Sequence, residues 1–166
     1  MQTVVIGRIF VKMLIFLDID GVMVPAKGWK SPELLADGFP AFSSIAVRAL
    51  KSLIDSETNI VLTTSHKAKY SIKEWKNIFA SRGLEVNNLT SLNSDSLLIK
   101  RKDEILNWFN INNLTKDFLI IDDDKSLNDL PKYLKDNLIL TKPLIGLTES
   151  DLSEVKYNAH KRFQIA

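Results

Sequence analysis

The chain has 166 residues, of which 45% are hydrophobic and 25% charged, and this is enough for one soluble domain with a buried core. Its 22 basic and 20 acidic residues give a net charge of +2, so no whole-molecule field of one sign favours nucleic acid or a membrane as a partner. It has no cysteine, which excludes disulfides, thiolate metal ligands and cysteine nucleophiles, so any metal must bind to oxygen or imidazole.

The first part of the chain is apolar but predicts neither a signal peptide nor a membrane span, because Arg8 and Lys12 interrupt the run over residues 4–17. We expect residues 1–12 to be an N-terminal extension or an extra strand, and residues 13–166 to form the folded domain. The lack of cysteine is compatible with a reducing compartment, and we expect a cytoplasmic protein with no membrane partner.

Short apolar runs that end in polar residues predict buried strands of a parallel sheet. The runs cover residues 13–17, 60–62, 118–121 and 138–140, with a weaker candidate over residues 84–89. Helical patterns alternate with them over residues 44–55 and 71–82, from Asp103 onward, and from Thr148 onward. This alternation predicts an α/β fold of three layers, in which a central, mostly parallel, Rossmann-like sheet carries helices on both faces.

Local signals mark the ends of these helices. Ser71 and Glu74 form a capping box, and Gly83 is well placed to end the helix that they begin. Thr148 and Asp151 predict a similar capping box at the start of the last helix. The expected core face of that helix consists of Leu152, Val155 and Ala159. Aromatic residues at helical spacing are also expected in the core: Trp75, Trp108 and Phe109.

Two carboxylates follow the first predicted strand. Asp18 and Asp20 are two residues apart, so they face the same side, and Gly21 allows a sharp turn after them. Ligands of open α/β sheets bind outside the carboxyl ends of the strands, where these residues and the acidic residues 122–124 are expected. Neighbouring carboxylates repel one another unless they share a cation or a proton, so the acidic groups predict a hard, oxygen-binding ion such as Mg²⁺.

A hydroxyl and a cation complete the predicted phosphate site. Thr64 follows the strand over residues 60–62 and can hold a phosphoryl oxygen together with local backbone amides. A lysine or arginine offsets the charge that builds during phosphoryl transfer, and Lys100, Arg101 and Lys102 offer this charge. Three predicted strands therefore end in residues of complementary chemistry.

The sequence of residues 18–22, DIDGV, resembles the first motif of the haloacid dehalogenase (HAD)-type phosphohydrolase superfamily, and the other motifs follow in family order. The resemblance implies that Asp18 is a nucleophile that forms a phosphoaspartate, and that Asp20 protonates the leaving oxygen and then activates water. It also implies that Mg²⁺ contacts the Asp18 carboxylate, the Asp20 backbone carbonyl and a carboxylate of the fourth motif. Asp123 is the first choice for that ligand, with Asp122 beside it.

The same resemblance favours Thr64 as the hydroxyl of the second motif, with Thr63 and Ser65 as neighbouring alternatives. For the third motif, alignment on Ile105 favours Arg101, but lysine is the commoner residue in the family, so the two flanking lysines stay open. The implied catalytic set is Asp18, Asp20, Thr64, Lys100 and Arg101, and the implied phosphate-binding set is Thr64, Ser65 and Arg101.

Residues 140–148 look like the tail of a small subgroup that includes phosphatase domains found in, or similar to, those of RNA-repair proteins. Members often carry a tryptophan and an arginine after the second motif, where this chain has His66 and Lys67. A lone histidine after a strand is more often a loop residue with an ordinary hydrogen bond, so His66 is left out of the predicted catalytic set.

Larger members of the superfamily insert a cap domain that closes over small substrates, and this chain has little room for one. We therefore expect an open site without a large cap domain. Its phosphorylated substrate is expected to be a nucleotide, a nucleic acid end or another bulky phosphate. The loop over residues 23–43 is the expected specificity element, and its Trp29 is a candidate for stacking on a base. The oligomeric state stays open.

The expected function is that of a Mg²⁺-dependent phosphomonoesterase with an aspartyl-phosphate intermediate. The alternative is a catalytically weak phosphate-binding module of a repair or regulatory system. A signalling receiver domain also groups aspartates, a hydroxyl and a lysine at strand ends. Its phospho-acceptor normally lies on a middle strand, however, and here the Asp-x-Asp-Gly sequence follows the first predicted strand.

Overall fold

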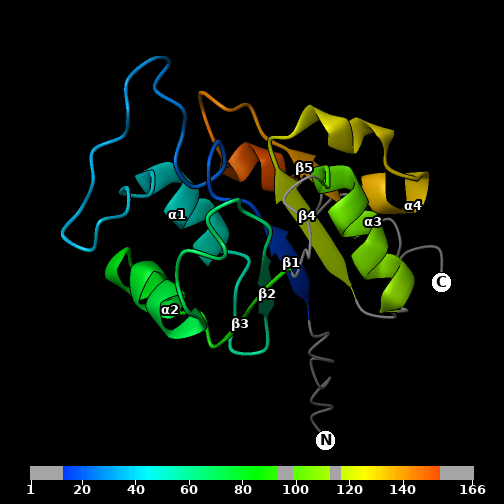
Figure 1. Cartoon of the computed structure of the whole chain (residues 1–166), viewed down its shortest axis with the longest axis horizontal. Coiled ribbons are helices and arrows are strands. Elements are labelled where there is room, and N and C mark those ends of the chain that lie inside the picture. The colour runs from blue at the N-terminus through cyan, green and yellow to red at the C-terminus, as the bar shows by residue number, and fades with distance from the viewer. Residues whose placement is uncertain (1–12, 93–98, 113–116, 154–166) are drawn as a thin grey trace, which may run out of the picture.

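The computed structural model describes residues 13–92, 99–112 and 117–153. Its centre is a sheet of five parallel strands in the order β3-β2-β1-β4-β5 (Figure 1). The strands are β1 (Leu14–Leu17), β2 (Asn59–Leu62), β3 (Asn88–Ser91), β4 (Phe118–Asp122) and β5 (Leu138–Leu140). Around them lie α1 (Ser44–Lys51), α2 (Ile72–Ser81), α3 (Arg101–Ile111), the 3₁₀ helix η1 (Lys125–Asp129) and α4 (Lys132–Lys135). The predicted α/β fold is confirmed.

Helices cover both faces of the sheet because successive residues of a strand point to opposite sides. Ile15 and Leu17 pack in one core with α1 and α2, whereas Phe16 packs in a second core with α3, η1 and α4. All three side chains are fully buried, as expected for a strand that is covered on both faces. Figure 1 shows the resulting three layers, with α1 and α2 on one side of the sheet and α3 and α4 on the other.

The predicted strand over residues 84–89 is wrong at its start. Gly83, at a φ of 82°, follows the end of α2, and the Leu84 N–H donates to the Phe79 carbonyl at 3.0 Å. Leu84 is fully buried and belongs to the cap of the helix, so its hydrophobicity serves the helix end. Strand β3 begins only at Asn88.

Helix α1 is shorter than the predicted pattern over residues 44–55. It ends at Lys51 because the N–H groups of Leu53 and Ile54 both donate to the Leu50 carbonyl, at 2.9 and 3.2 Å, and this closes a turn. Both side chains still pack against the core, so their spacing was a signal of burial and not of helix length.

The predicted helix caps are present. Ser71 accepts from the N–H of Glu74, and the Glu74 carboxylate accepts from the N–H of Ser71. Thr148 and Asp151 form the same pair at the start of the last helix, of which residues 149–153 are described. Three predictions lie outside the described residues, namely those for Val155, for Ala159 and for residues 1–12.

The loop over residues 23–43 closes on itself and is tied to the end of α2. The Ser43 N–H donates to the Met23 carbonyl at 2.8 Å, which brings the two ends of the loop together. Arg82 donates to two loop carbonyls at 2.9 Å each and to both oxygens of Asp37. The loop is therefore held at its ends and along its second half.

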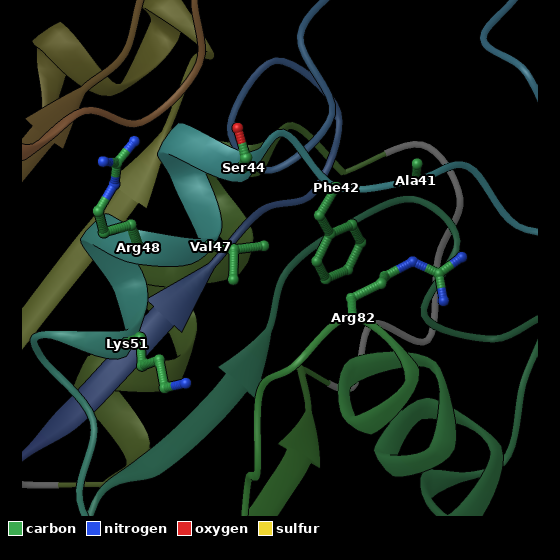
Figure 2. Close-up of a pocket in the computed structure, with 7 residues that line it drawn as sticks. All are labelled: Ala41, Phe42, Ser44, Val47, Arg48, Lys51 and Arg82. Atoms are coloured by element: carbon green, nitrogen blue, oxygen red, sulfur yellow. The ribbon is translucent and has the colours of Figure 1, made fainter.

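Arg82 also forms part of the wall of a hollow of about 470 Å³ beside α1 (Figure 2). The lining residues are Ala41, Phe42, Ser44, Val47, Arg48, Lys51 and Arg82. The Arg82 guanidinium lies 5.1 Å from the Phe42 ring centroid, so this cation already has protein partners. The hollow has no acidic lining residue, and none of the predicted catalytic or metal-binding residues lines it.

No large cap domain occurs in the ranges that the structure covers. The segment between β1 and β2 contains the loop over residues 23–43 and α1, and the described part of the segment between β2 and α3 contains α2 and β3. Among the described helices, none is long and apolar enough to cross a membrane.

Candidate active site

Three neighbouring strands end at the same level at one edge of the sheet. β1 lies between β2 and β4, and Leu17 pairs with Leu62 on one side and with Ile121 on the other. The residue that follows each of these three paired positions is polar and buried, and the parallel register alone brings these residues together: Asp18, Thr63 and Asp122.

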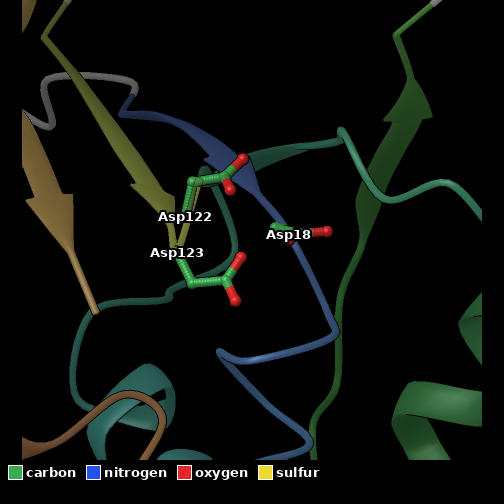
Figure 3. Close-up of side chains that lie close together, drawn as sticks. All are labelled: Asp18, Asp122 and Asp123. Carbon is green, nitrogen blue, oxygen red and sulfur yellow. The ribbon is translucent and has the colours of Figure 1, made fainter. Parts of the chain in front are cut away.

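Asp18, Asp122 and Asp123 form an acidic cluster, in which one carboxylate oxygen of each residue lies within 4.8 Å of the others (Figure 3). Burial and then the charge of Asp122 raise the pKa of Asp18 to about 7. Burial is also the largest cause of the raised pKa values of Asp122 and Asp123. Ionisation of these buried carboxyls is therefore unfavourable without a bound cation, and a hard cation fits such a set of oxygen donors.

Arg101 is the cation that the fold places against the acidic cluster. It is the first residue of α3, and its Nη1 donates to Asp122 Oδ2 at 2.6 Å and to Thr63 Oγ1 at 3.0 Å. The same nitrogen lies 3.5 Å from Asp18 Oδ1. Burial lowers the pKa of Arg101, but the carboxylates of Asp122, Asp18 and Glu104 outweigh it, so its pKa is raised overall. Arg101 therefore stays charged.

The two lysines beside Arg101 are placed differently. Lys100 is the N-cap residue of α3 and is exposed, and Lys102 is half-buried. The side chain of neither lysine makes a hydrogen bond or an ion pair with any described residue. The start of α3 thus directs one of the three basic residues to the acidic cluster, and it does not bring Lys100 there.

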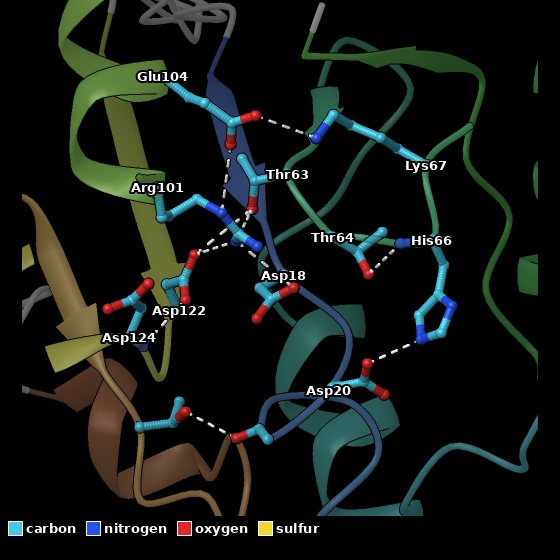
Figure 4. A network of polar contacts seen from close by, with 12 residues as sticks. Asp18, Asp20, Thr63, Thr64, His66, Lys67, Arg101, Glu104, Asp122 and Asp124 are labelled. Carbon is cyan, nitrogen blue, oxygen red and sulfur yellow. Dashed lines mark hydrogen bonds and ion pairs between the residues drawn. The ribbon is translucent and has the colours of Figure 1, made fainter. Parts of the chain in front are cut away.

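Glu104, for which the sequence predicted no role in the site, forms an ion pair with Arg101. Its Oε2 lies 3.5 Å from Arg101 Nε, and its Oε1 accepts from Lys67 Nζ at 3.3 Å (Figure 4). The Glu104 side chain is only 8% exposed, so both contacts are shielded from water. The spacing of three residues between Arg101 and Glu104 on one helix was an available signal. Lys67 lies in the segment after β2, and no local spacing in the sequence predicted its contact with Glu104.

Gly21 makes room for Asp123. Its φ of 75° lies in the left-handed region, and a Cβ at this position would clash with the Asp123 carboxylate. The Thr141 hydroxyl, just after β5, donates to the Gly21 carbonyl at 2.7 Å and fixes the turn. Asp122, by contrast, is bound to protein donors, since its Oδ1 accepts from the Asp124 N–H at 3.0 Å. Asp123 is therefore the fourth-motif carboxylate that lies against the turn of the first motif.

The three hydroxyl residues after β2 have different surroundings. Thr63 bonds to Arg101, as described above, and Thr64 is fully buried, with its Oγ1 accepting from the His66 N–H at 3.3 Å. Ser65 is exposed. The hydroxyl of Thr64 is therefore held in one place, and that of Ser65 faces solvent.

Asp20 is exposed, and its side chain is not a member of the acidic cluster. Its Oδ2 lies 2.8 Å from Nε2 of His66 (Figure 4). The sequence reasoning interpreted His66 as a loop residue with an ordinary hydrogen bond, and the partner of that bond is a predicted catalytic residue. The two residues are 46 positions apart, and no local pattern signals their contact.

The parallel sheet and the acidic, hydroxyl and basic residues at its edge define a domain of HAD type. The model of a family described as "HAD domain in Swiss Army Knife RNA repair proteins" matches residues 14–152, and the chain belongs to this family. Membership places the domain in a phosphohydrolase superfamily. No curated protein and no solved structure matches the chain.

Proposed function

We propose that this domain is a Mg²⁺-dependent phosphomonoesterase that acts through an aspartyl-phosphate on Asp18. The observation that carries the proposal is the position of Asp18, whose carboxylate lies 3.5 Å from the Arg101 guanidinium and clusters with the carboxylates of Asp122 and Asp123. A nucleophilic carboxylate beside a permanent cation and a cation-binding cluster suits phosphoryl transfer. Family membership supports the same reaction class.

The proposed metal site uses the Asp18 carboxylate, Asp123 and the backbone carbonyl of Asp20, with Asp122 beside them. The clustered carboxylates and the turn at Gly21, which admits the Asp123 side chain, fit a hard cation. When bound, Mg²⁺ would neutralise the carboxylates and the phosphoryl oxygens.

In the first proposed step, a carboxylate oxygen of Asp18 attacks phosphorus, and the bond from phosphorus to the leaving oxygen breaks. Asp20 gives its proton to that oxygen. In the second step, water attacks phosphorus, Asp20 takes the proton of the water, and the bond to Asp18 breaks, which releases inorganic phosphate. Arg101 offsets the developing charge, and Thr64 and nearby backbone amides hold phosphoryl oxygens. The exposed Ser65 is a further phosphate contact in this proposal.

The proposed substrates are nucleotides, nucleic acid ends or other bulky phosphates. The lack of a large cap in the described part of the chain supports an open site. Trp29 supports a contact with a base, because its side chain is 90% exposed and Lys30 Nζ lies 5.5 Å from its ring centroid. We also propose a cytoplasmic location, which the absence of cysteine supports.

The test is Mg²⁺-dependent release of phosphate from p-nitrophenyl phosphate by the wild type and by Asp18→Asn. The substitution keeps the size of the side chain and removes the nucleophile, so we expect activity to fall by at least about 10³-fold. Asp124→Asn is the matched control, because Asp124 follows the same cluster in sequence but accepts from the Ser126 N–H and caps η1. Equal activity in Asp18→Asn and the wild type would overturn the mechanism.

A phosphate-binding module without turnover is the second candidate. It predicts no hydrolysis across a panel of 5′- and 3′-phosphorylated oligonucleotides, mononucleotides, sugar phosphates and phosphopeptides with Mg²⁺ present. It also predicts that at least one member of that panel still binds. Hydrolysis of any member that Asp18→Asn abolishes excludes this candidate.

A further inference from the structure

We propose that His66 is a positioning residue, which holds the Asp20 carboxyl in the orientation needed for proton transfer and is itself held by Phe39 of the loop over residues 23–43. The inference rests on the proposed function, because it takes Asp20 as the group that transfers the proton. It adds to that function a residue outside the four motifs, and it connects the loop to the chemistry.

Asp20 needs an external support to keep one orientation. Its side chain is 55% exposed, and an exposed carboxyl rotates freely unless a hydrogen bond holds it. Among the described residues, His66 provides the hydrogen bond to this carboxyl, at 2.8 Å between Nε2 and Oδ2. The acidic cluster does not include the Asp20 side chain, so the residues that fix Asp18 do not fix Asp20.

The contact gives the two carboxyl oxygens of Asp20 different roles. With a proton on Nε2, His66 donates to Oδ2, and Oδ1 remains for the substrate. Oδ1 then carries the proton that goes to the leaving oxygen, and the same atom takes a proton from water in the second step. His66 keeps its own proton throughout and does not touch the phosphoryl group, so its role is to position Asp20.

His66 is held on two sides. Its backbone N–H donates to Thr64 Oγ1 at 3.3 Å, and its ring meets the Phe39 ring edge to face, with 5.6 Å between centroids and planes at 88°. Phe39 is buried and also meets Trp75 and Tyr70 edge to face, at 5.3 and 5.8 Å. One side of the imidazole therefore packs against a fixed aromatic ring, although 27% of the His66 side chain is exposed.

Phe39 connects this support to the loop. Its carbonyl accepts from Arg82 Nη2 at 2.9 Å, and the Arg82 guanidinium lies 5.7 Å from the Phe39 ring centroid. A continuous set of contacts thus leads from the end of α2 through Phe39 and His66 to Asp20. Because the proposed specificity loop carries Phe39, the position of the loop and the orientation of Asp20 are coupled.

Two variants separate the hydrogen bond from the ring contact. His66→Gln retains an N–H donor that can reach Asp20, and His66→Phe retains a ring against Phe39 but has no donor. We measure kcat/KM for p-nitrophenyl phosphate, whose leaving group departs readily without a proton, and for an alkyl phosphate, whose leaving oxygen requires one. A purely structural role for His66 would affect both esters equally.

We expect His66→Phe to lower kcat/KM for the alkyl phosphate by about 10- to 100-fold and that for p-nitrophenyl phosphate by no more than about 3-fold, because only the alkyl ester depends on the proton from Asp20 in the first step. His66→Gln should recover most of the loss. Equal losses for both esters in His66→Phe, or no loss for either, would overturn the proposal.

A second measurement does not depend on activity. In ¹⁵N-histidine-labelled protein without metal, the Nε2 resonance of His66 should shift in Asp20→Asn and stay in place in Asp124→Asn, because Asp20 is the partner of this nitrogen among the residues that the structure describes. An unchanged resonance in Asp20→Asn would contradict the pairing itself. If the wild type hydrolyses neither ester, the proposed function fails and the positioning role fails with it. Hydrolysis of both esters without the difference between them overturns the positioning role alone.

Discussion

The acidic cluster and the Asp20–His66 pair each contain one residue of the short segment after β1, Asp18 and Asp20, yet different parts of the molecule hold these two residues. Asp18 and Asp122 are buried and aligned by the register of β1 and β4, which are adjacent strands of the sheet. Asp20, two residues later, is exposed and is held by a histidine that a loop supports. The sheet therefore fixes the proposed nucleophile, whereas the loop and α2 fix the group proposed to transfer the proton.

This difference predicts that changes at the sheet edge will affect stability and every substrate, and that changes near the loop will affect proton transfer alone.

Among substitutions at the sheet edge, Arg101→Ala should have the largest effect on stability. It leaves Asp122 and Asp18 buried without their cation, so we expect the free energy of unfolding to fall by about 3 kcal/mol. We also expect kcat to fall by about 100-fold, because the developing phosphoryl charge loses its partner. Lys100→Ala is the control, since Lys100 is the exposed neighbour. Urea unfolding and phosphatase assays of both variants measure these effects, and equal losses in both would show that Arg101 has no special role.

Gly21→Ala should destabilise the domain by roughly 2 kcal/mol and weaken Mg²⁺ binding, because the added Cβ clashes with the Asp123 carboxylate at a positive φ. Gly38→Ala is a close control. Gly38 has a φ of 78°, against 75° for Gly21, and no atom lies near its Cβ position, so it reports the cost of backbone strain alone. Unfolding curves and Mg²⁺ titrations of the two variants separate strain from the clash, and identical Mg²⁺ affinities would contradict a role for Asp123 in the metal site.

The stability of the metal-free protein should decrease as pH rises from about 4 to about 7. The pKa of Asp18 is about 7 in the folded state against 3.8 for an ordinary aspartate, so the folded state binds more protons across this range. Deprotonation therefore costs stability as pH rises, and the raised pKa values of Asp122 and Asp123 act in the same direction.

Asp18→Asn should remove the contribution of Asp18 and stabilise the metal-free protein by roughly 2 kcal/mol at about pH 7.5, with little change near pH 4. Urea unfolding with a chelator at both pH values measures the difference. A wild type and variant with the same pH dependence would contradict an unusually protonated Asp18.

Phe39→Leu should have the smallest effect on catalysis, and we expect it to act only through the loop and His66. It keeps most of the apolar volume and removes the ring that supports His66, so kcat/KM for an alkyl phosphate should fall by about 2- to 10-fold. This range follows from an edge-to-face pair of about 0.5–1.5 kcal/mol. Phe42→Leu is the matched control, because Phe42 packs against Phe39 and Phe79 and has no ring contact with His66. Measurements of kcat/KM for both esters should distinguish the two variants. Equal losses in Phe39→Leu and Phe42→Leu would contradict the proposed coupling between the loop and Asp20.

Local sequence patterns predicted the fold and much of the site. Apolar runs closed by polar residues located β1, β2, β4 and β5, and because parallel strands end at a common edge, the same runs indicated that Asp18 and Asp122 would meet. The capping box at Ser71 and Glu74 located the start of α2, since both partners lie within one helical turn.

Tertiary structure decided the contacts between residues that are distant in the chain. Which of the three basic residues faces the acidic cluster depended on the residue at which α3 begins, and that start put Arg101 there. The approach of Asp123 to Gly21, and of His66 to Asp20, required separate segments to pack together. Periodicity and capping report interactions over a few residues, so they determined the strands and helices, whereas long-range packing determined how the residues after β1 are supported.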